Sequence, residues 1–327
     1  MTQFRLLQTA GFLCAALGLF GASAAAQEDL DRAAAIVIGG GQPFGLYFPE
    51  AGAICHLYAR TDGADRCLVD SFAGSVDALA ALRTGRVDFA LVQSDWQQHA
   101  VKGTSRFRAN GPDKGLRSVF SLHGEALTLV ARSDIGISVL DDLAGKNVDL
   151  GPKESYAAKF MEAVLKLEGL DRDELAEVSN LPTSVSMTRL CEGSIDAAAI
   201  LSSHPNLHLI GALRRCDLKL IPLSGSAIDE LLHAGRGLSE ITIPAGTYRG
   251  QNSDVPTFGI RSTLVTRDTQ PADVVSAIVT STLDGLSWLR SRHPSLTPLD
   301  SRQMTVQGLA APLHEGAARV YRERGLR

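Results

Sequence analysis

Residues 85–90 read Gly85-Arg86-Val87-Asp88-Phe89-Ala90, and residues 193–198 repeat the pattern as Gly193-Ser194-Ile195-Asp196-Ala197-Ala198. Each copy follows a predicted helix that begins near a Ser-Val pair, Ser75-Val76 before the first copy and Ser184-Val185 before the second. A glycine that ends a helix just before a short strand gives this pattern, and unrelated folds also reuse such junctions. Two lobes of similar design would explain why the pattern occurs twice in one chain.

Short apolar runs alternate with segments of helical periodicity along the rest of the chain. This alternation is typical of βαβ units with largely parallel sheets, so the sequence predicts an α/β protein. Pro271 predicts the start of a long helix that runs to about Arg292, since proline is tolerated in a first helical turn. The predicted strands cover residues 36–38, 68–71, 87–92, 127–131, 148–150, 195–201, 218–222 and 258–266.

Residues 1–26 have the features of a cleavable signal peptide. A basic start, a short apolar run and a small-residue site ending at Ala26 are all present, and the run is too short for a permanent membrane span. An uncleaved anchor is the alternative. Cys14 lies inside the apolar run after Leu13, so we expect it to be removed rather than lipidated. The sequence therefore predicts export to the periplasm.

Cys55, Cys67, Cys191 and Cys216 remain after this cleavage. An even number of cysteines in an exported chain favours disulfides over a metal site. Three connectivities are possible, and the short separations favour Cys55 with Cys67 and Cys191 with Cys216.

The size and charge of the mature chain limit its function. About 300 residues suggest two compact units rather than one. The net charge of −4 is spread along the chain, which argues against nucleic acid as a partner. No apolar stretch after Phe20 is long enough to cross a membrane.

Small polar residues follow several predicted strands, at residues 39–41, 71–75, 93–95 and 151–155. Ligands of open α/β sheets gather at these carboxyl ends, where helix N-termini can hold an anion without a dedicated cation. The alternative for Ser75, Asp95 and Ser155 is that each side chain only caps its own helix.

Motifs for catalysis and cofactors are absent or weak. The glycines at 39–45 resemble a dinucleotide loop, but the third fingerprint glycine is displaced. No nucleophile elbow, zinc-protease motif, Walker loop or calcium loop is present, and the histidines are scattered. We therefore expect a protein that is not an enzyme and needs no cofactor or metal. His204 is the histidine of most interest, because it precedes Pro205 at a predicted strand end.

Five further segments of the sequence cover residues 87–96, 142–148, 203–205, 248–259 and 311–317. In their order and spacing they together resemble the TAXI family of TRAP transporter solute receptors, and the likeness covers nearly the whole mature chain. The two cysteine pairs also resemble a subgroup of that family.

The resemblance implies a type II periplasmic binding fold with a ligand between two lobes. It implies lobe 1 over residues 27–126 and 258–327, and lobe 2 over residues 127–257. A small organic anion or amino acid, glutamate-like or a dicarboxylate, would pass from this receptor, expected to be a monomer, to a sodium-coupled membrane permease. A periplasmic sensor acting on a signalling partner is an alternative, and an enzyme on the same fold is another.

One segment departs from the family pattern. After the strand at Val148 the family has a Gly-Ser-Gly turn, and here Ser155 keeps the serine while Glu154 and Tyr156 replace the glycines. Side chains at these positions restrict the approach of the backbone to a ligand. A carboxylate at Glu154 would also weaken anion binding if it faced the cleft.

The candidate ligand-binding residues combine aromatic surface, hydrogen-bonding groups and one acid. The tyrosines would supply apolar surface with a polar tip, the serines and Gln93 hydrogen bonds, and Asp95 an acceptor for an ammonium group. The alternative for Tyr47 is that it belongs to the core of its amphipathic helix. The set is Tyr47, Ser75, Gln93, Ser94, Asp95, Ser155, His204, Tyr248 and Thr257.

Overall fold

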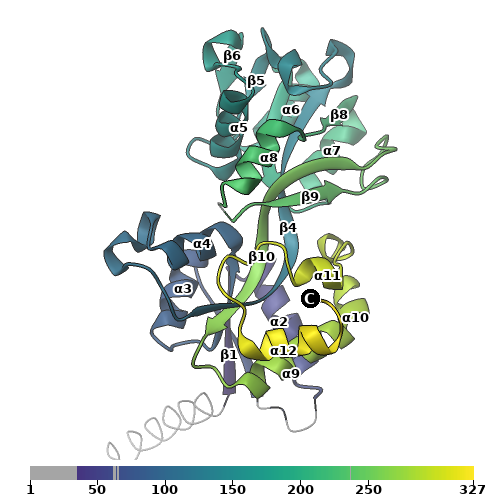
Figure 1. Cartoon of the computed structure of the whole chain (residues 1–327). Helices are drawn as coiled ribbons and strands as arrows, with labels where there is room; N and C mark the ends of the chain where they lie inside the picture. Colours follow the sequence, from purple (N-terminus) through teal and green to yellow (C-terminus); the bar gives the residue numbers. More distant parts are fainter. Residues whose placement is uncertain (1–34, 62–63, 65, 236) are drawn as a thin grey trace, which may run out of the picture.

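The computed structural model describes residues 35–61, 64, 66–235 and 237–327. The predicted signal peptide and Cys14 lie outside these residues. Figure 1 shows two lobes joined by two long strands, β4 (Leu116–Arg132) and β10 (Val255–Arg267). Within the described residues, no helix has both the length and the apolar character needed to cross a membrane.

Lobe 1 is built from both ends of the described chain (Figure 1). Its other strands are β1 (Ala35–Gly40), β2 (Arg66–Ser71) and β3 (Phe89–Gln93). Its helices are α2 (Tyr47–Tyr58), α3 (Ser75–Arg83), α4 (Ser94–Lys102), α9 (Ala272–Asp284), α10 (Leu286–Arg290), α11 (Ser301–Met304) and α12 (Glu315–Glu323). Short 3-10 turns η1 (Ser105–Asn110) and η5 (Pro294–Leu296) complete it.

Lobe 2 is the middle of the chain (Figure 1). Its other strands are β5 (Asn147–Asp149), β6 (Glu177–Ser179), β7 (Ala197–Ser202), β8 (Leu218–Ile221) and β9 (Ser239–Ile243). Its helices are α5 (Tyr156–Leu167), α6 (Thr183–Glu192), α7 (Leu207–Arg215) and α8 (Ser226–His233), with 3-10 turns η2 (Ser133–Ile135), η3 (Leu140–Leu143) and η4 (Arg172–Glu174).

The strands of the described residues form one continuous sheet in the order β2-β1-β3-β10-β4-β7-β5-β6. β8 also pairs with β4, and β9 with β10. One half of β10 pairs with β3 of lobe 1 and the other half with β9 of lobe 2. Lobes that share two crossing strands in this way have the α/β architecture of type II periplasmic binding proteins. The lobe boundaries at residues 127 and 257 fall inside β4 and β10 and stay a prediction.

The expectation of largely parallel sheets was wrong for the centre of the molecule. β1 pairs in parallel with β2 and β3, and β5 pairs in parallel with β6 and β7. The pairings that β4 and β10 make with the other described strands are all antiparallel, including the pairing of the two with each other. The reason is that these two strands run between the lobes in opposite directions.

The repeated Gly-x-x-Asp pattern has the same structure in both lobes. Gly85 and Gly193 each take φ of 74°, a conformation that glycine adopts without strain. The Asp88 carboxylate accepts a hydrogen bond from the Val37 amide at 2.8 Å, and the Asp196 carboxylate accepts one from the Asn147 amide at 2.9 Å. In each lobe the aspartate therefore ties the start of one strand to its parallel neighbour.

Helices cover both faces of the sheet in each lobe. In β1, Ile36 and Ile38 pack with α2 and α9, whereas Val37 packs with α3 on the opposite face. In β4, Leu127 and Leu129 pack with α5, and Val130 packs with α6 and α7. Period-two alternation with both faces apolar is expected for strands buried between two layers of helices.

The helix predicted from Pro271 to Arg292 is interrupted at Gly285, between α9 and α10. A side chain at this position would be obstructed, because a Cβ on Gly285 would lie 2.3 Å from a methyl carbon of Leu57. β6 and β9 were not predicted, and both are short edge strands of the described sheet.

Both predicted disulfides are confirmed. Cys55 of α2 is joined to Cys67 of β2, with the Cα atoms 5.2 Å apart, and Cys191 of α6 is joined to Cys216 after α7, with the Cα atoms 5.3 Å apart. Each bond closes a short local loop.

Labelling the denatured, unreduced mature protein with a thiol reagent should find no reactive cysteine. Replacing Cys191 and Cys216 together by serine should lower the free energy of unfolding by about 3 kcal/mol, the value that chain entropy gives for short loops. The same labelling after reduction, which should find four thiols, is the control. Labelling of all four cysteines before reduction would disprove both bonds.

Candidate functional site

The N-terminus of α4 in lobe 1 contacts lobe 2 directly. Ser94 Oγ donates a hydrogen bond to the Gly237 carbonyl at 2.5 Å, and Gln98 Nε2 donates one to the Gly235 carbonyl at 2.7 Å. Gly235 and Gly237 lie between α8 and β9. A Cβ on Gly237 would lie within 2.7 Å of the backbone of Ser94 and Asp95, so the close approach requires glycine.

Asp95 lies in the first turn of α4, beside this contact. Only 4% of the residue is exposed. The Tyr156 hydroxyl and the Trp96 amide interact with its carboxylate, but neither reaches an oxygen with ordinary hydrogen-bond geometry. Burial raises the pKa of the Asp95 carboxyl above its usual value, and the Tyr156 hydroxyl, the Trp96 amide and His99 oppose the shift only in part. A buried carboxylate normally accepts well-formed hydrogen bonds or pairs with a cation. A further donor or a cation would therefore stabilise the Asp95 carboxylate.

Tyr156 is the first residue of α5 and belongs to lobe 2. Burial and the negative charge of Asp95 together raise the pKa of the Tyr156 hydroxyl, so the phenol stays protonated. Its ring is 5.5 Å from the ring of Phe160, which in turn is 6.0 Å from the ring of Phe258. The helix starts of α4 and α5 therefore face each other with an acid on one side and an aromatic residue on the other.

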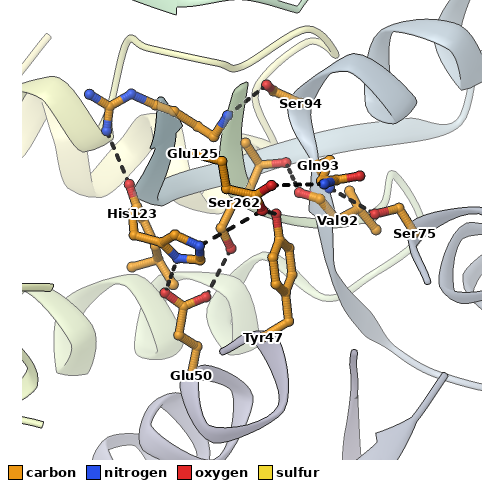
Figure 2. Close-up of polar contacts among 12 residues, drawn as sticks. Tyr47, Glu50, Ser75, Val92, Gln93, Ser94, His123, Glu125 and Ser262 are labelled. Carbon is orange, nitrogen blue, oxygen red and sulfur yellow. Dashed lines mark hydrogen bonds and ion pairs between the residues drawn. The ribbon is translucent and has the colours of Figure 1, made fainter. Parts of the chain in front are cut away.

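Glu125 is a second carboxylate at the base of the lobes, within the crossing strand β4. The Tyr47 hydroxyl donates to Glu125 Oε1 at 2.8 Å, and Gln93 Nε2 donates to Oε2 at 3.1 Å (Figure 2). Burial and the charge of Glu125 raise the pKa of Tyr47 well above its ordinary value. Within the described residues, no lysine or arginine forms an ion pair with Asp95 or Glu125.

A buried acid-histidine pair, Glu50 and His123, lies next to Tyr47 and Glu125. His123 Nδ1 lies 2.5 Å from Glu50 Oε1, and Ser262 Oγ donates to Glu50 Oε2 at 2.9 Å (Figure 2). Burial by itself would lower the pKa of His123, but the charge and hydrogen bond of Glu50, with the charge of Glu125, outweigh it and raise the pKa. The Tyr47 ring packs edge-on against the His123 ring at 5.4 Å. The pair therefore holds Tyr47 in position.

Three of the predicted hydroxyl groups hold backbone in place. Ser75 Oγ accepts a hydrogen bond from the Gln93 amide at 3.0 Å, Ser94 Oγ accepts one from the Arg261 amide at 3.0 Å, and Ser155 Oγ accepts one from the Ala158 amide at 3.2 Å. Ser155 is the cap of α5, as the alternative for this residue had it. A ligand role for these serines stays a prediction.

His204, Tyr248 and Thr257 form bonds inside lobe 2. His204 lies between Thr128 Oγ1 at 2.8 Å and the Tyr248 hydroxyl at 2.6 Å, and burial lowers its pKa to about 4. The Tyr248 hydroxyl also accepts from the Asn206 amide at 2.7 Å, and the Tyr248 side chain packs in the core formed with α6 and α7. Thr257 Oγ1 donates to the Leu127 carbonyl. The structure does not place these three with Asp95, and their proposed contact with a ligand stays a prediction.

The turn that departs from the family pattern takes a glycine-like conformation without a glycine. Glu154 has φ of 62°, and its side chain is exposed. Residues other than glycine rarely take this conformation, which strains the backbone where it does occur.

Glu125 and the Glu50–His123 pair were missed by the sequence reasoning. The predicted strand began at residue 127, because His123, Gly124 and Glu125 interrupt the apolar pattern. Two ionisable residues inside a long run of otherwise buried strand were the available signal. Among the described residues, no group of His, Cys, Asp and Glu side chains is arranged to hold a metal ion.

A family model described as the NMT1-like family matches residues 38–325. The periplasmic aliphatic sulphonate binding protein SsuA from Escherichia coli is 15% identical, with a TM-score of 0.46 over 79% of this chain and 76% of that chain. A putative sulfonate-binding SsuA from Methylobacillus flagellatus is 15% identical, with a TM-score of 0.49 over 88% and 84%. An amino acid ABC transporter substrate-binding protein from Streptococcus pneumoniae, bound to L-arginine, is 13% identical, with a TM-score of 0.39 over 81% and 94%.

Proposed function

The chain belongs to the NMT1-like family, and from this membership and the two-lobed fold we propose that it is a periplasmic solute-binding receptor of a transporter. It captures a small molecule between its lobes and releases it, chemically unchanged, to a membrane permease. The predicted signal peptide and the two disulfides support export to an oxidising compartment.

The ligand class follows from the charge between the lobes. Asp95 is buried, accepts no hydrogen bond of ordinary geometry from the described residues and forms no ion pair with a lysine or arginine there. An unpaired carboxylate at this depth is costly, and the ammonium group of a ligand would remove that cost. Glu125 adds a second negative charge, as its effect on the pKa of Asp95 indicates. Of the ligand classes predicted from the sequence, these charges favour an amino acid or another ammonium compound over a dicarboxylate.

The aromatic side chains suit the same ligand. Tyr156 and Tyr47 present protonated phenols on rings, and the face of an aromatic ring attracts a cation. An ammonium ion between α4 and α5 would contact the Asp95 carboxylate from lobe 1 and Tyr156 from lobe 2. Binding would thereby hold the lobes together, as hinge closure requires.

The permease partner is proposed from the sequence resemblance alone. The likeness to TAXI receptors favours a sodium-coupled TRAP permease, and a gene for a fused multi-span permease beside the gene of this protein would support it. A neighbouring kinase gene would instead favour a ligand sensor.

Mass spectrometry of the small molecules released when the purified mature protein is denatured tests the proposed function. We expect one enriched compound with a protonated amine and a stoichiometry near one per chain. Asp95→Asn protein purified in parallel should release much less of it. A retained compound without any basic nitrogen would contradict the proposed ligand class.

A further inference from the structure

A hollow of about 460 Å³ on the surface of lobe 2 is formed where α7 ends and β8 begins, together with the loop between β9 and β10. Every residue that lines it belongs to lobe 2, and Asp95 and Tyr156 are not among them. α7 begins close after His204 at the end of β7, and its nine residues span about 13 Å. The hollow at the other end of this helix is therefore separate from the proposed solute site.

Basic side chains dominate the lining of this hollow. Asp217 is the one acid of the lining, and its carboxylate accepts a hydrogen bond from Ser133 Oγ at 3.1 Å. No acid among the described residues forms an ion pair with any of the basic side chains. The hollow thus gathers four positive charges and one negative charge on a chain whose net charge is −4. The basic residues are Arg214, Arg215, Lys219 and Arg249.

Helix stability explains only part of this charge. Arg214 and Arg215 lie in the last turn of α7, where cations interact favourably with the helix dipole without any other partner. Lys219 belongs to β8 and Arg249 to the loop after β9, so the dipole of α7 does not account for them. Like charges from three elements repel one another, and an anionic partner would offset this repulsion.

The backbone that carries these cations is held in place. The disulfide of Cys216 joins the end of α7 to α6. In the loop with Arg249, the Tyr248 side chain is buried at 4% exposure, and Gln251 Nε2 donates hydrogen bonds to the carbonyls of residues 243 and 244 at 3.0 Å each. A partner would therefore bind a preorganised surface, without the cost of ordering its backbone.

We propose that this hollow docks an acidic segment of a partner protein, a loop or terminus with several neighbouring Asp or Glu side chains. The planar fork of an arginine matches the two oxygens of a carboxylate. Because the three arginines are exposed, a single small anion gains little from each of them. A segment with several carboxylates contacts several cations at once. The proposal goes beyond the proposed function, since it concerns a surface that the solute does not touch.

An anionic membrane surface fits this part of lobe 2 less well. A bilayer is broad and flat, whereas the cations here line a recess. The exposed carboxylate of Asp217 in the same lining would also repel lipid phosphates. A peptide side chain can enter the recess and avoid Asp217, so the shape and the charge together favour a protein segment.

Fluorescence anisotropy with a dye-labelled peptide of alternating glutamate and serine tests the proposal on the mature protein. The peptide should bind saturably at low ionic strength and more weakly as salt is added, and a peptide with glutamine in place of glutamate should not bind. Arg214→Gln combined with Arg249→Gln should weaken binding by about ten-fold, the effect of losing charge-assisted contacts.

Arg106→Gln combined with Arg108→Gln is the matched control. Both arginines are exposed on η1 of lobe 1 and form no ion pair within the described part of the chain, so the control changes the net charge equally. It should alter peptide binding by less than about two-fold. Both double variants should retain the co-purified solute as the parent does, which separates this surface from the site at Asp95.

Co-sedimentation with vesicles of phosphatidylglycerol and phosphatidylcholine tests the membrane alternative. The parent protein should stay in the supernatant at the salt concentration at which the glutamate peptide binds. Vesicle binding that is lost in the Arg214→Gln, Arg249→Gln variant would overturn the proposal. So would the absence of peptide binding to the parent at low salt, or equal losses in the two double variants.

Discussion

Asp95→Asn should weaken binding of the retained solute by roughly ten-fold to more than a hundred-fold, the range for a lost charge-assisted hydrogen bond. The same change should raise the stability of the ligand-free protein, because it removes a buried carboxylate whose loss of solvation outweighs its interactions with Tyr156 and Trp96. Calorimetric titration measures the first effect, and thermal unfolding without ligand measures the second. Loss of affinity with gain of stability is characteristic of a binding residue rather than a structural one.

The pH dependence of stability has a defined sign at this residue. Burial raises the folded pKa of Asp95 above the ordinary 3.8, so the ionised form destabilises the fold. The contribution of the Asp95 carboxyl to folding stability is fully present below pH 3.8, where the carboxyl is protonated. It is lost as the pH rises through the raised pKa of the folded state. Asp95→Asn should abolish this part of the pH dependence.

Asp77→Asn is the matched control for Asp95→Asn. Asp77 is also an acid in the first turn of a lobe 1 helix, α3, but its side chain is exposed. This variant should bind the solute within about two-fold of the parent, since an exposed charge is screened by solvent. If Asp95→Asn also stays within two-fold of the parent, the carboxylate has no part in binding.

Glu50→Ala should lower the free energy of unfolding by about 3–5 kcal/mol, the cost of breaking a buried charged pair by removing one partner. Glu50 is 1% exposed, and its removal leaves His123 and the Ser262 hydroxyl without their acceptor. Urea unfolding of the parent and the variant measures the loss. Glu50→Gln keeps an acceptor oxygen in place and should lose less. A loss below about 1 kcal/mol for Glu50→Ala would show that the pair does not stabilise the fold.

The same pair sets how stability changes above neutral pH. The folded pKa of His123 is raised above 6.5, so its contribution is complete below pH 6.5 and is lost as the pH rises through the raised value. His204 acts in the opposite sense, because its folded pKa is lowered to about 4 and its contribution is lost as the pH falls from 6.5 toward that value. The Glu50→Ala variant should no longer lose stability as the pH rises through the raised pKa of His123. It should still lose stability as the pH falls toward the pKa of His204.

The repeated Gly-x-x-Asp pattern made the two-lobed fold predictable, because both copies satisfy the same geometric need. Each glycine ends a helix, and each aspartate ties two parallel strands together. The antiparallel centre was not predictable in this way. The directions of β4 and β10 follow from how two lobes are joined through space, and local periodicity carries no information about that.

The sequence could predict the site residues that follow β3, but not Glu125 in β4. Asp95 and Gln93 stand at the end of β3, where a sheet-based argument looks for ligands. Glu125 lies in the middle of β4, and its importance depends on Tyr47 and Gln93 reaching it from other elements. A serine after a strand can contact either a ligand or the backbone, so the sequence could not decide between these roles for Ser75 and Ser155. In the structure the side-chain oxygens of both residues accept hydrogen bonds from backbone amides.

A crystal structure of the mature protein with its co-purified solute tests the central claim most directly, since it locates the solute and identifies its charged groups together. We expect a solute between the starts of α4 and α5, with a positively charged nitrogen within hydrogen-bonding distance of the Asp95 carboxylate and the Tyr156 ring against it. A solute that leaves Asp95 without a contact, or that places a carboxylate or another anionic group against it, would contradict the account.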